Sequence, residues 1–528
     1  MWMRETVGRG TWLDKVASRI IAREEKLGRS ASIIRVESGL SASGIPHIGS
    51  LGDAVRAYGI KLALEDSGYK SALIAFSDDL DALRRVPTGL PESLKKYIGH
   101  PVSSVPDPFD CHSSYAEHMT LMLRDALDEL GIKYEHRTGA ETYASGILNQ
   151  QVLRILEHAQ RIGRKIAEML GQTKFEVVLP YFPICENCGR IALAQSLGFL
   201  REEKRVTYHC LGAEIGRQWV DGCGHKGEAD ITAGKGKLSW KGEFAARWAA
   251  LDIRFEAYGK DLADSVKVND WVCQEILDFP PPYHVRYEHF LFGGKKLSKS
   301  IGNVFTPQTW LRYGTPESLM LLMFKRIVGT RNLTIEEIPK YVDEYDSLED
   351  TYFGRVKMEN QAKLRQLKGL YEYVNHLRPP AEPSVHVPHR LLVQLASVAP
   401  KGKTSEFIGR RLVSYGVARE IDSELSKRIE VASNWAEDFK TLEKVELKLS
   451  ENEKKAISQL ASYLMSEPDS EEIQSHIFDV ARSHALEPGN FFKILYRILV
   501  GQEKGPRLGP YIADIGPKST AERLLQHT

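Results

Sequence analysis

The chain has 528 residues, of which 42% are hydrophobic and 27% are charged. At roughly 100 to 200 residues per domain, this length predicts about three to five domains. The composition excludes disorder as the dominant state, because there is enough apolar surface to offset chain entropy. Seventy-one Lys and Arg residues balance 70 Asp and Glu residues. This balance argues against binding of polyanions through bulk charge and leaves only local basic patches.

No run of about 18 consecutive apolar residues occurs, so the sequence predicts no membrane span. The N-terminal segment MWMRETVGRGTWLDKVASRII lacks the apolar core and small-residue cleavage site of a signal peptide. We therefore expect a cytoplasmic protein.

The first elements follow the order of a nucleotide-binding sheet. Apolar residues four apart predict an amphipathic helix over residues 12–26, and Ile33–Val36 reads as a short buried strand followed by a turn-rich run. A helix is expected from Ser50 to Asp66 and a second strand from Ser71 to Phe76, which leads into Ser77–Asp81. This βαβ order predicts an α/β sheet that binds its ligand at the carboxyl ends of the strands.

Later segments differ in character. A single helix is expected over residues 145–172, and a glycine-rich stretch with strand-like pieces such as 205–209 follows. We expect this stretch to be inserted between two halves of the α/β domain. After about residue 340 helical periodicity dominates to about residue 500, interrupted by a predicted loop at 378–383.

Two short motifs indicate phosphate binding. Gly44–Ser50 lies after a strand and at a predicted helix start, where backbone N–H groups and the helix dipole favour a phosphate. Within it, His47 adds a donor and Gly49 allows close approach of a nucleotide. Gly293–Asn303 places lysines and serines between glycines, which suits a loop that closes over a triphosphate. An ordinary capped turn and a solvated basic loop are the alternatives for either motif alone.

Four cysteines within 39 residues predict a metal site. A Cys-x2-Cys pair followed by two further thiols suits tetrahedral zinc in a closed structural site, with ligands Cys185, Cys188, Cys210 and Cys223. His225 competes with Cys223 for the fourth position. Cys111 and Cys273 are expected to be buried thiols. His112 and His118, with Glu117 between them, lack an obvious third ligand, so we expect them to shape the active-site wall.

Together the two motifs resemble the signatures of class I aminoacyl-tRNA synthetases, in the form His47-Ile48-Gly49-Ser50 and Lys296-Leu297-Ser298-Lys299-Ser300. Further segments make the chain similar to the archaeal-type class I lysyl-tRNA synthetase family. They are Glu37–Gly39, Asp78–Pro87, Val105–His118, Arg247-Trp248, Phe255–Asp261, Tyr287-Glu288 and Gly505–Pro510. Two positions depart from the family pattern. Leu262 stands where the family usually has histidine, and Ile301 stands where it usually has lysine, while Lys299 restores the general class I spacing.

The resemblance implies activation of lysine by ATP, followed by transfer of the lysyl group to the 3′ end of tRNA(Lys). The implied catalytic residues are His47, Lys296 and Lys299. The implied ATP-binding residues are His47, Gly49, Ser50, Lys296, Ser298 and Lys299. ATP with Mg²⁺ is the expected substrate, and Zn²⁺ has a structural role. Such catalysis consists mostly of positioning and fixed positive charge.

Lysine selection requires a carboxylate that faces the strongly hydrated ammonium. Glu37, at the end of the first strand, is the best candidate, and a capping or salt-bridging role is the alternative for this residue. The resemblance adds Gly39 and Ser41 as substrate contacts, with Trp240 and Tyr287 as pocket walls.

We therefore expect an α/β protein with a Rossmann-type parallel-sheet catalytic domain. Its first half and an N-terminal helix span residues 1–110, and a connective insertion with the zinc-binding subdomain spans 111–240. The second half with the signature lysine loop spans 241–345, and an all-α anticodon-binding domain spans 346–528. The basic run 401–411 is a candidate tRNA contact, and we expect a monomer.

Two alternative functions are open at this point. One is a class I synthetase for another amino acid, and the other is a diverged noncatalytic RNA-binding paralogue.

Overall fold

The computed structural model describes residues 7–30, 32–216, 218–288, 290–296, 305–400, 402–439, 447, 449–501 and 503–528. These residues form two compact units. The first runs to Thr309 and also contains Met320–Thr334 and Met358–Pro379. The second contains Trp310–Leu319, Ile335–Lys357 and Pro380–Thr528.

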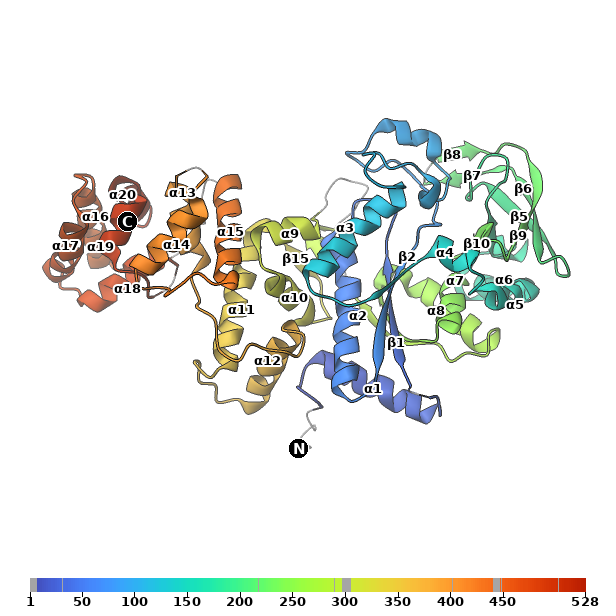
Figure 1. Cartoon of the computed structure of the whole chain (residues 1–528), viewed down its shortest axis with the longest axis horizontal. Coiled ribbons are helices and arrows are strands. Elements are labelled where there is room, and N and C mark those ends of the chain that lie inside the picture. The colour runs from blue at the N-terminus through green and yellow to red at the C-terminus, as the bar shows by residue number, and fades with distance from the viewer. Residues whose placement is uncertain are drawn as a thin grey trace. The chain divides into compact units, whose positions relative to one another are not determined.

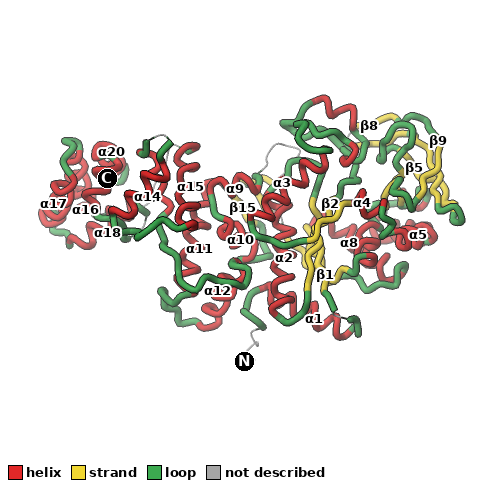
Figure 2. The backbone as a smooth tube through the Cα atoms, viewed as in Figure 1, coloured by secondary structure: helices red, strands yellow, loops and turns green. Residues whose placement is uncertain are grey.

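A parallel five-stranded sheet forms the centre of the first unit (Figures 1 and 2). The strand order is β12-β11-β1-β2-β3, and every neighbouring pair is parallel. The strands are β1 (Ile34–Leu40), β2 (Ser71–Ser77), β3 (Glu135–Thr138), β11 (Ile253–Gly259) and β12 (Tyr283–Tyr287). The predicted mixed α/β fold with a parallel sheet is therefore confirmed.

The strand order reverses between β1 and β11, because the chain adds β2 and β3 on one side of β1 and later adds β11 and β12 on the other. Such a switch point leaves a crevice at the carboxyl ends of the two strands. The helices of this part are α1 (Trp12–Lys26), α2 (Ile48–Asp66), α3 (Tyr115–Glu129), α7 (Glu243–Ala250) and α8 (Ala263–Glu275). In Figure 1, α2 lies on one side of the sheet, and α7 and α8 lie on the other.

An insert separates β3 from β11. It contains α4 (Gly139–Ala144), α5 (Asn149–Glu157), α6 (Ala159–Leu170) and the short strands β4 (Tyr181–Pro183), β5 (Ala194–Leu200), β6 (Arg205–Cys210), β7 (Gly212–Ile215), β8 (Gln218–Asp221), β9 (Lys226–Asp230) and β10 (Gly236–Leu238). The prediction of one helix over 145–172 is wrong. His158 has a non-helical backbone (φ −106°, ψ 15°), and this residue divides the stretch into α5 and α6.

The first unit is completed by later parts of the chain. A small sheet of β13 (Phe290–Phe292), β14 (Lys295–Lys296) and β15 (Arg331–Leu333) follows the main sheet. Helix α12 (Gln361–Val374) also packs here, since Tyr373 Oη donates to Asp14 Oδ1 at 2.8 Å. Helices α9 (Pro307–Tyr313) and α10 (Pro316–Phe324) contain residues of both units.

The second unit is helical, as expected for the C-terminal region. It contains α11 (Ile338–Tyr352), α13 (His389–Val398), α14 (Thr404–Ser414), α15 (Ser423–Asp438), α16 (Glu451–Leu464), α17 (Ser470–Ser483), α18 (Pro488–Leu499), α19 (Leu508–Ile515) and α20 (Pro517–Leu525). The pairs α13 with α15, α16 with α20, and α17 with α19 make its main helix contacts. The predicted break at 378–383 is non-helical.

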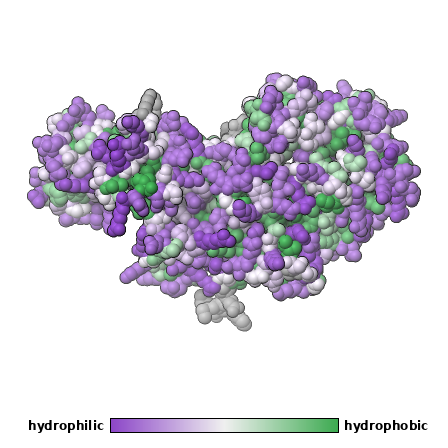
Figure 3. Space-filling model, in the orientation of Figure 1, coloured by the Kyte–Doolittle hydropathy of each residue, from purple (hydrophilic) through white to green (hydrophobic). Residues whose placement is uncertain are grey.

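Within the described ranges, no helix is both long enough and apolar enough to cross a membrane. Hydrophilic residues cover most of the face drawn in Figure 3, with smaller hydrophobic areas between them. This surface agrees with the 27% of charged residues in the sequence.

Candidate active site

A cavity of about 180 Å³ opens at the carboxyl ends of the central strands. It lies where the strand order reverses, so residues after β1 and at the end of β11 line it together with residues of α2, α7, α8 and β12. The lining residues are Gly39, Ser41, Ala42, Ser43, Asp53, Asp78, Asp81, Trp240, Phe244, Arg247, Trp248, Glu256, Ala257, Tyr258, Leu262, Val266, His284 and Tyr287. The position agrees with the general rule for ligands of open α/β sheets.

Four of the five residues predicted to bind substrate line this cavity: Gly39, Ser41, Trp240 and Tyr287. Glu37 does not line it. The Glu37 side chain has no exposed surface, and its Oε1 lies 2.7 Å from a guanidinium nitrogen of Arg247. In the structure, therefore, Glu37 makes the buried salt bridge that was its alternative role. Leu262, which replaces the expected histidine, lines the cavity and is 37% exposed.

Arg247 is the centre of a buried charge network. A second guanidinium nitrogen lies 2.7 Å from Asp78 Oδ1, and the guanidinium carbon lies 4.1 Å from the centre of the Phe76 ring. Glu256 is more distant, at 4.0 Å from Arg247, and accepts a hydrogen bond from Trp248 Nε1 at 2.5 Å. One cation thus balances several acids, as buried charges require a partner.

Lys237 extends the network into the insert. This residue of β10 is 3% exposed, and its Nζ lies 2.7 Å from Asp81 and 2.6 Å from Glu243 at the start of α7. The contact ties the end of the insert to the loop after β2. The lining of the cavity as a whole contains four carboxylates and one guanidinium.

Burial raises the pKa of the acids in this network. Burial raises the pKa of Glu37 and of Asp78, against the opposing effect of Arg247. Burial and the neighbouring Glu37 raise the pKa of Glu256 well above its usual range. Burial likewise raises the pKa of Glu243 to about 7, although Lys237 opposes it. Of these acids, Asp78 and Glu256 line the cavity, and a cation bound beside them would stabilise their ionised forms.

Sequence reasoning did not assign roles to Asp53, Arg247 or Glu256. Arg247 and Glu256 lie in segments that carried part of the resemblance, Arg247-Trp248 and Phe255–Asp261. The resemblance did not show which side chains pair with them. Pairing of side chains from α7, β1 and β2 depends on tertiary packing, which periodicity does not report.

The first motif begins α2. His47 is the N-cap residue, and its Nδ1 accepts the backbone N–H of Ser50 at 3.2 Å. An accepting Nδ1 carries no hydrogen, so in the neutral imidazole the hydrogen is on Nε2, which makes that atom a donor. A Cβ atom at Gly49 would lie 3.0 Å from the His47 ring. Glycine at this position therefore leaves room for the capping imidazole. His47, Gly49 and Ser50 do not line the cavity described above.

The chain on either side of the second motif lies beside the same helix start. The backbone N–H of Ile48 donates to the carbonyl oxygen of Phe305 at 2.8 Å. Phe290 lies 3.9 Å from the position of a Cβ at Gly49, and the Phe292 and Phe305 rings are 5.0 Å apart. Lys296 is in β14, and nothing further is described of its side chain. Ser298, Lys299 and Ile301 lie outside the described residues.

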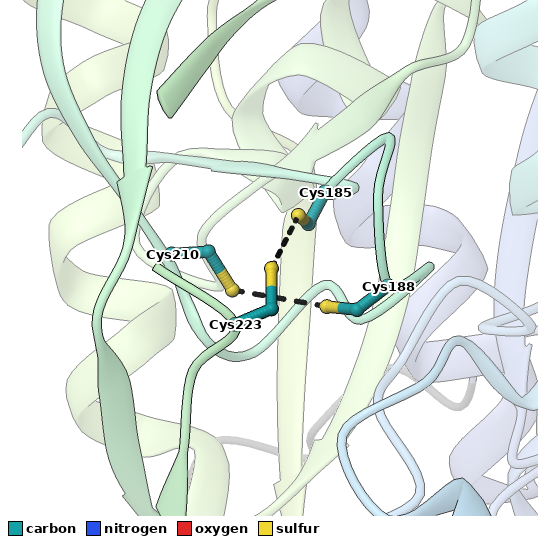
Figure 4. Close-up of side chains that lie close together, drawn as sticks. All are labelled: Cys185, Cys188, Cys210 and Cys223. Carbon is teal, nitrogen blue, oxygen red and sulfur yellow. Dashed lines mark hydrogen bonds between the residues drawn. The ribbon is translucent and has the colours of Figure 1, made fainter. Parts of the chain in front are cut away.

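The four predicted metal ligands converge in the insert (Figure 4). The sulfur atoms of Cys185 and Cys223 are 3.6 Å apart, and those of Cys188 and Cys210 are 3.8 Å apart. All four lie within 4.8 Å of one another. A tetrahedron with zinc–sulfur bonds of about 2.3 Å has edges of about 3.8 Å, so the sulfur positions fit a zinc ion. His225 instead places Nε2 2.7 Å from Glu186 Oε1.

Comparison with known proteins adds to this geometry. The family model described as tRNA synthetases class I (K) matches residues 10–377. A lysine–tRNA ligase of Cenarchaeum symbiosum is 50% identical over 518 residues, which cover 98% of each chain. Lysine–tRNA ligases of Haloarcula marismortui and Rickettsia bellii are each 31% identical, with 99% of this chain and 98% of the relative covered. With its parallel sheet, its switch-point cavity and this similarity along nearly its whole length, the chain belongs to the class I tRNA synthetase (K) family.

Proposed function

We propose that the chain is a lysine–tRNA ligase that activates lysine with ATP and transfers the lysyl group to the 3′ end of tRNA(Lys). The observation that carries the proposal is the meeting of two distant parts of the chain. The Ile48 N–H and the Phe305 carbonyl join the first motif to the chain that follows the second. This contact supports a single phosphate-binding region built from both.

The cavity supports lysine as the amino acid. Its lining contains Asp53, Asp78, Asp81 and Glu256, of which Asp78 pairs with Arg247, Asp81 with Lys237 and Asp53 with Arg56. Arg247 is 4.0 Å from Glu256, so a ligand ammonium that approaches Glu256 would give this acid a closer partner. Aromatic side chains of Trp240 and Tyr287 provide surface for the aliphatic part of lysine.

In the first step, a carboxylate oxygen of lysine attacks the α-phosphorus of ATP. The bond to the β-phosphate breaks, and Mg²⁺-bound pyrophosphate leaves with the electron pair. His47 would donate from Nε2 to a phosphate oxygen, while Lys296 and Lys299 would supply positive charge to the phosphates. Ser298 and the glycine backbone at Gly49 would complete the phosphate contacts. Because negative charge accumulates on the phosphoryl oxygens, fixed donors at these points lower the barrier.

In the second step, the 2′-hydroxyl of the terminal adenosine of tRNA attacks the lysyl carbonyl carbon and releases AMP. We assign recognition of the anticodon loop to those helices of residues 346–528 that belong to the second unit. The exposed Arg410 on α14 is a candidate phosphate contact, whereas Arg411 is paired with Asp514 at 2.7 Å.

The cysteine cluster completes the proposal as a structural zinc site. Four thiolates would hold the ion and fix the glycine-rich part of the insert. The site offers no open coordination position to a substrate. We further propose that the protein is a cytoplasmic monomer, which light scattering of the purified chain would test.

The test is exchange of pyrophosphate into ATP with a panel of lysine, ornithine, arginine and glutamate, compared between the wild type and two variants. His47→Asn retains a good N-cap residue, and His47→Ala does not. We expect exchange only with lysine. Both variants should lose about 10²- to 10³-fold in rate, while only His47→Ala should also lose about 1 kcal/mol of stability.

Three results would contradict the proposal. Exchange that depends on another amino acid would make the chain a synthetase of different specificity. Tight tRNA binding without any exchange would make it a noncatalytic RNA-binding protein. Full activity of His47→Asn would remove His47 from the phosphate site.

A further inference from the structure

A histidine of the second unit lies between two carboxylates. This unit contains Ile335–Lys357, and the chain rejoins it at Pro380 after a passage through the first unit. The rejoining segment has no helix before α13 begins. Within it, His386 contacts Glu349 and Asp350, which are neighbouring residues near the end of α11. One side chain thus joins the segment that leads into α13 to α11.

Both ring nitrogens of His386 face an acid. Nε2 donates to Glu349 Oε2, and Nδ1 lies 3.3 Å from Asp350 Oδ1. The imidazole is 15% exposed, and the Glu349 side chain has no exposed surface. Glu349 Oε2 also accepts the backbone N–H of Ser384 at 3.1 Å, and the Ser384 hydroxyl lies 3.2 Å from Glu349 Oε1. Two residues of the rejoining segment therefore contact the same buried carboxylate.

The number of hydrogens on the ring favours its protonated form. A neutral imidazole carries one N–H, so one of its two nitrogens is an acceptor. In that form a nitrogen lone pair would face an oxygen of either Glu349 or Asp350. Asp350 Oδ1 also accepts from Arg355 at 3.1 Å, as an ionised carboxylate does. The imidazolium donates to both acids, and it supplies a positive partner to the buried Glu349.

The helices packed around this contact add mostly acids. Besides Glu349 and Asp350, α11 contributes Asp343 and Asp346, α13 contributes His389, and α15 contributes Glu424 and Arg428. Arg428 is paired with Asp346 at 2.7 Å, and Glu424 Oε2 lies 2.7 Å from the Ser384 hydroxyl.

These charges act on the proton of the ring. Burial lowers the pKa of His386, but the hydrogen bond to Glu349 and the charges of Asp346, Asp350 and Glu349 outweigh this effect and raise the pKa above its usual value. The surroundings therefore stabilise the same form of the ring that the two contacts require.

We propose that His386 is a pH-sensitive clamp: its imidazolium holds the segment before α13 to α11, and loss of the proton releases this segment. Deprotonation would leave the buried Glu349 without the positive charge of the ring, and such an acid must then be reached by water or take up a proton. Helix α13 packs against both α11 and α15 (Figure 1). The clamp thus makes the attachment of this helix depend on pH. This inference does not depend on the ligase activity proposed above.

The pH dependence has a defined direction. Because the pKa of His386 is higher in the folded state than in the unfolded state, its stabilisation is fully present below the unfolded value of about 6.5. The stabilisation is lost as the pH rises through the folded value. The equilibrium between the closed and the released segment should shift about tenfold for each pH unit that separates the two values.

The first measurement is the charge state of the ring. NMR of the full-length protein labelled with ¹⁵N in histidine gives the ring nitrogen signals, and the absence of one set in His386→Gln assigns His386. We expect a ring with two N–H groups that titrates with a midpoint above 6.5. A midpoint at or below 6.5 would overturn the proposal.

Hydrogen exchange of the peptide that contains Ser384 follows the segment itself, because the Ser384 N–H donates to Glu349. After correction for the intrinsic exchange rate, protection in the wild type should fall between pH 6 and pH 9. His386→Gln has no charge to lose, so its protection should be low already at pH 6. His386→Arg carries a permanent cation and should stay protected at pH 9.

His484→Gln is the matched control, since His484 Nε2 contacts Gln459 Oε1 at 2.7 Å and not an acid. It should behave as the wild type. Asp343 and Glu424 also titrate, so the decisive quantity is the difference between the wild type and His386→Gln at each pH. Equal pH dependence in these two proteins would contradict the clamp. Unchanged exchange in α17 reports that each variant is folded, and if His386→Arg is not, the other two proteins and the ring signals still decide.

Discussion

Arg247 has no exposed surface and lies 2.7 Å from both Glu37 and Asp78. Truncation of one member of such a group leaves the other charges buried without compensation. The main effect of the arginine is therefore to compensate the buried charge of these acids, rather than to add net stability. Its loss should first affect β1, which carries Glu37, and the end of β2, which Asp78 follows.

We expect Arg247→Met to lower the free energy of unfolding of the first unit by about 3–5 kcal/mol. Arg286→Met is the control, since Arg286 is exposed on β12, and it should change stability by less than about 0.5 kcal/mol. Hydrogen exchange of the β1 and β2 peptides would measure the stability change in each of the two variants. Equal protection in the two variants would show that the buried network is not needed for folding.

Asp79 gives a pH dependence with a defined sign. Burial raises the pKa of Asp79 to about 6, and its Oδ1 accepts the Ala140 N–H at 2.8 Å. The folded state therefore holds the proton more tightly than the unfolded state. Its contribution to stability is present at low pH and is lost as the pH rises from about 4 to about 6.

We expect Asp79→Asn to abolish the loss of stability that the wild type shows as the pH rises from about 4 to about 6. The variant should be more stable than the wild type above pH 6 by at most about 3 kcal/mol, and the difference should shrink below pH 4. Urea unfolding at pH 4 and pH 7.5 tests this directly. A difference that grows as the pH falls would have the wrong sign for a buried, protonated acid.

At the scale of elements, the sequence predicted α1, β1, α2 and β2 well, because their hydrophobic patterns are local. The helix expected over 145–172 failed for a physical reason. Apolar periodicity continues on both sides of His158, whose Nδ1 lies 2.9 Å from the Arg154 carbonyl oxygen, so the pattern does not register the break. Helix α12 was likewise assigned to the C-terminal region, although Tyr373 attaches it to the first unit through Asp14.

Gly163 in α6 tests how packing overrides helix propensity. In an exposed helix, Gly→Ala stabilises by about 1 kcal/mol. Here a Cβ would lie 2.0 Å from the carbonyl oxygen of Phe175, so the backbone must move. We expect Gly163→Ala to destabilise the insert by about 1–3 kcal/mol, seen as faster hydrogen exchange in α6. Arg164→Ala, on the exposed side of the same helix, should have little effect.

At the scale of the whole molecule, the net charge of +1 requires that tRNA be bound through local groups. Composition alone predicted this. It did not predict that Arg411 pairs with Asp514, while the Arg410 side chain keeps 69% of its surface exposed and contacts Glu406 at 3.3 Å. Which basic residues are available to RNA is therefore a property of the folded surface.

We expect Arg410→Ala to reduce the salt dependence of tRNA binding. The slope of log Kd against log salt should fall by about 0.7 to 0.9, the effect of one phosphate contact. Lysine-dependent pyrophosphate exchange should not change. Filter binding between 50 and 200 mM salt provides the measurement, with Arg419→Ala, another exposed arginine of this unit, as the control. An unchanged slope would assign the RNA contact elsewhere.

The attachment of the insert through Lys237 limits how this enzyme can be recombined. Chimaeras that exchange the insert with that of a relative would transplant a folded module, but its last strand delivers the ammonium that neutralises Asp81 and Glu243. A donor module without a basic group at that point would leave both acids without this partner, beside the cavity that Asp81 lines. Successful grafts should therefore carry this lysine, or replace both acids in the same step.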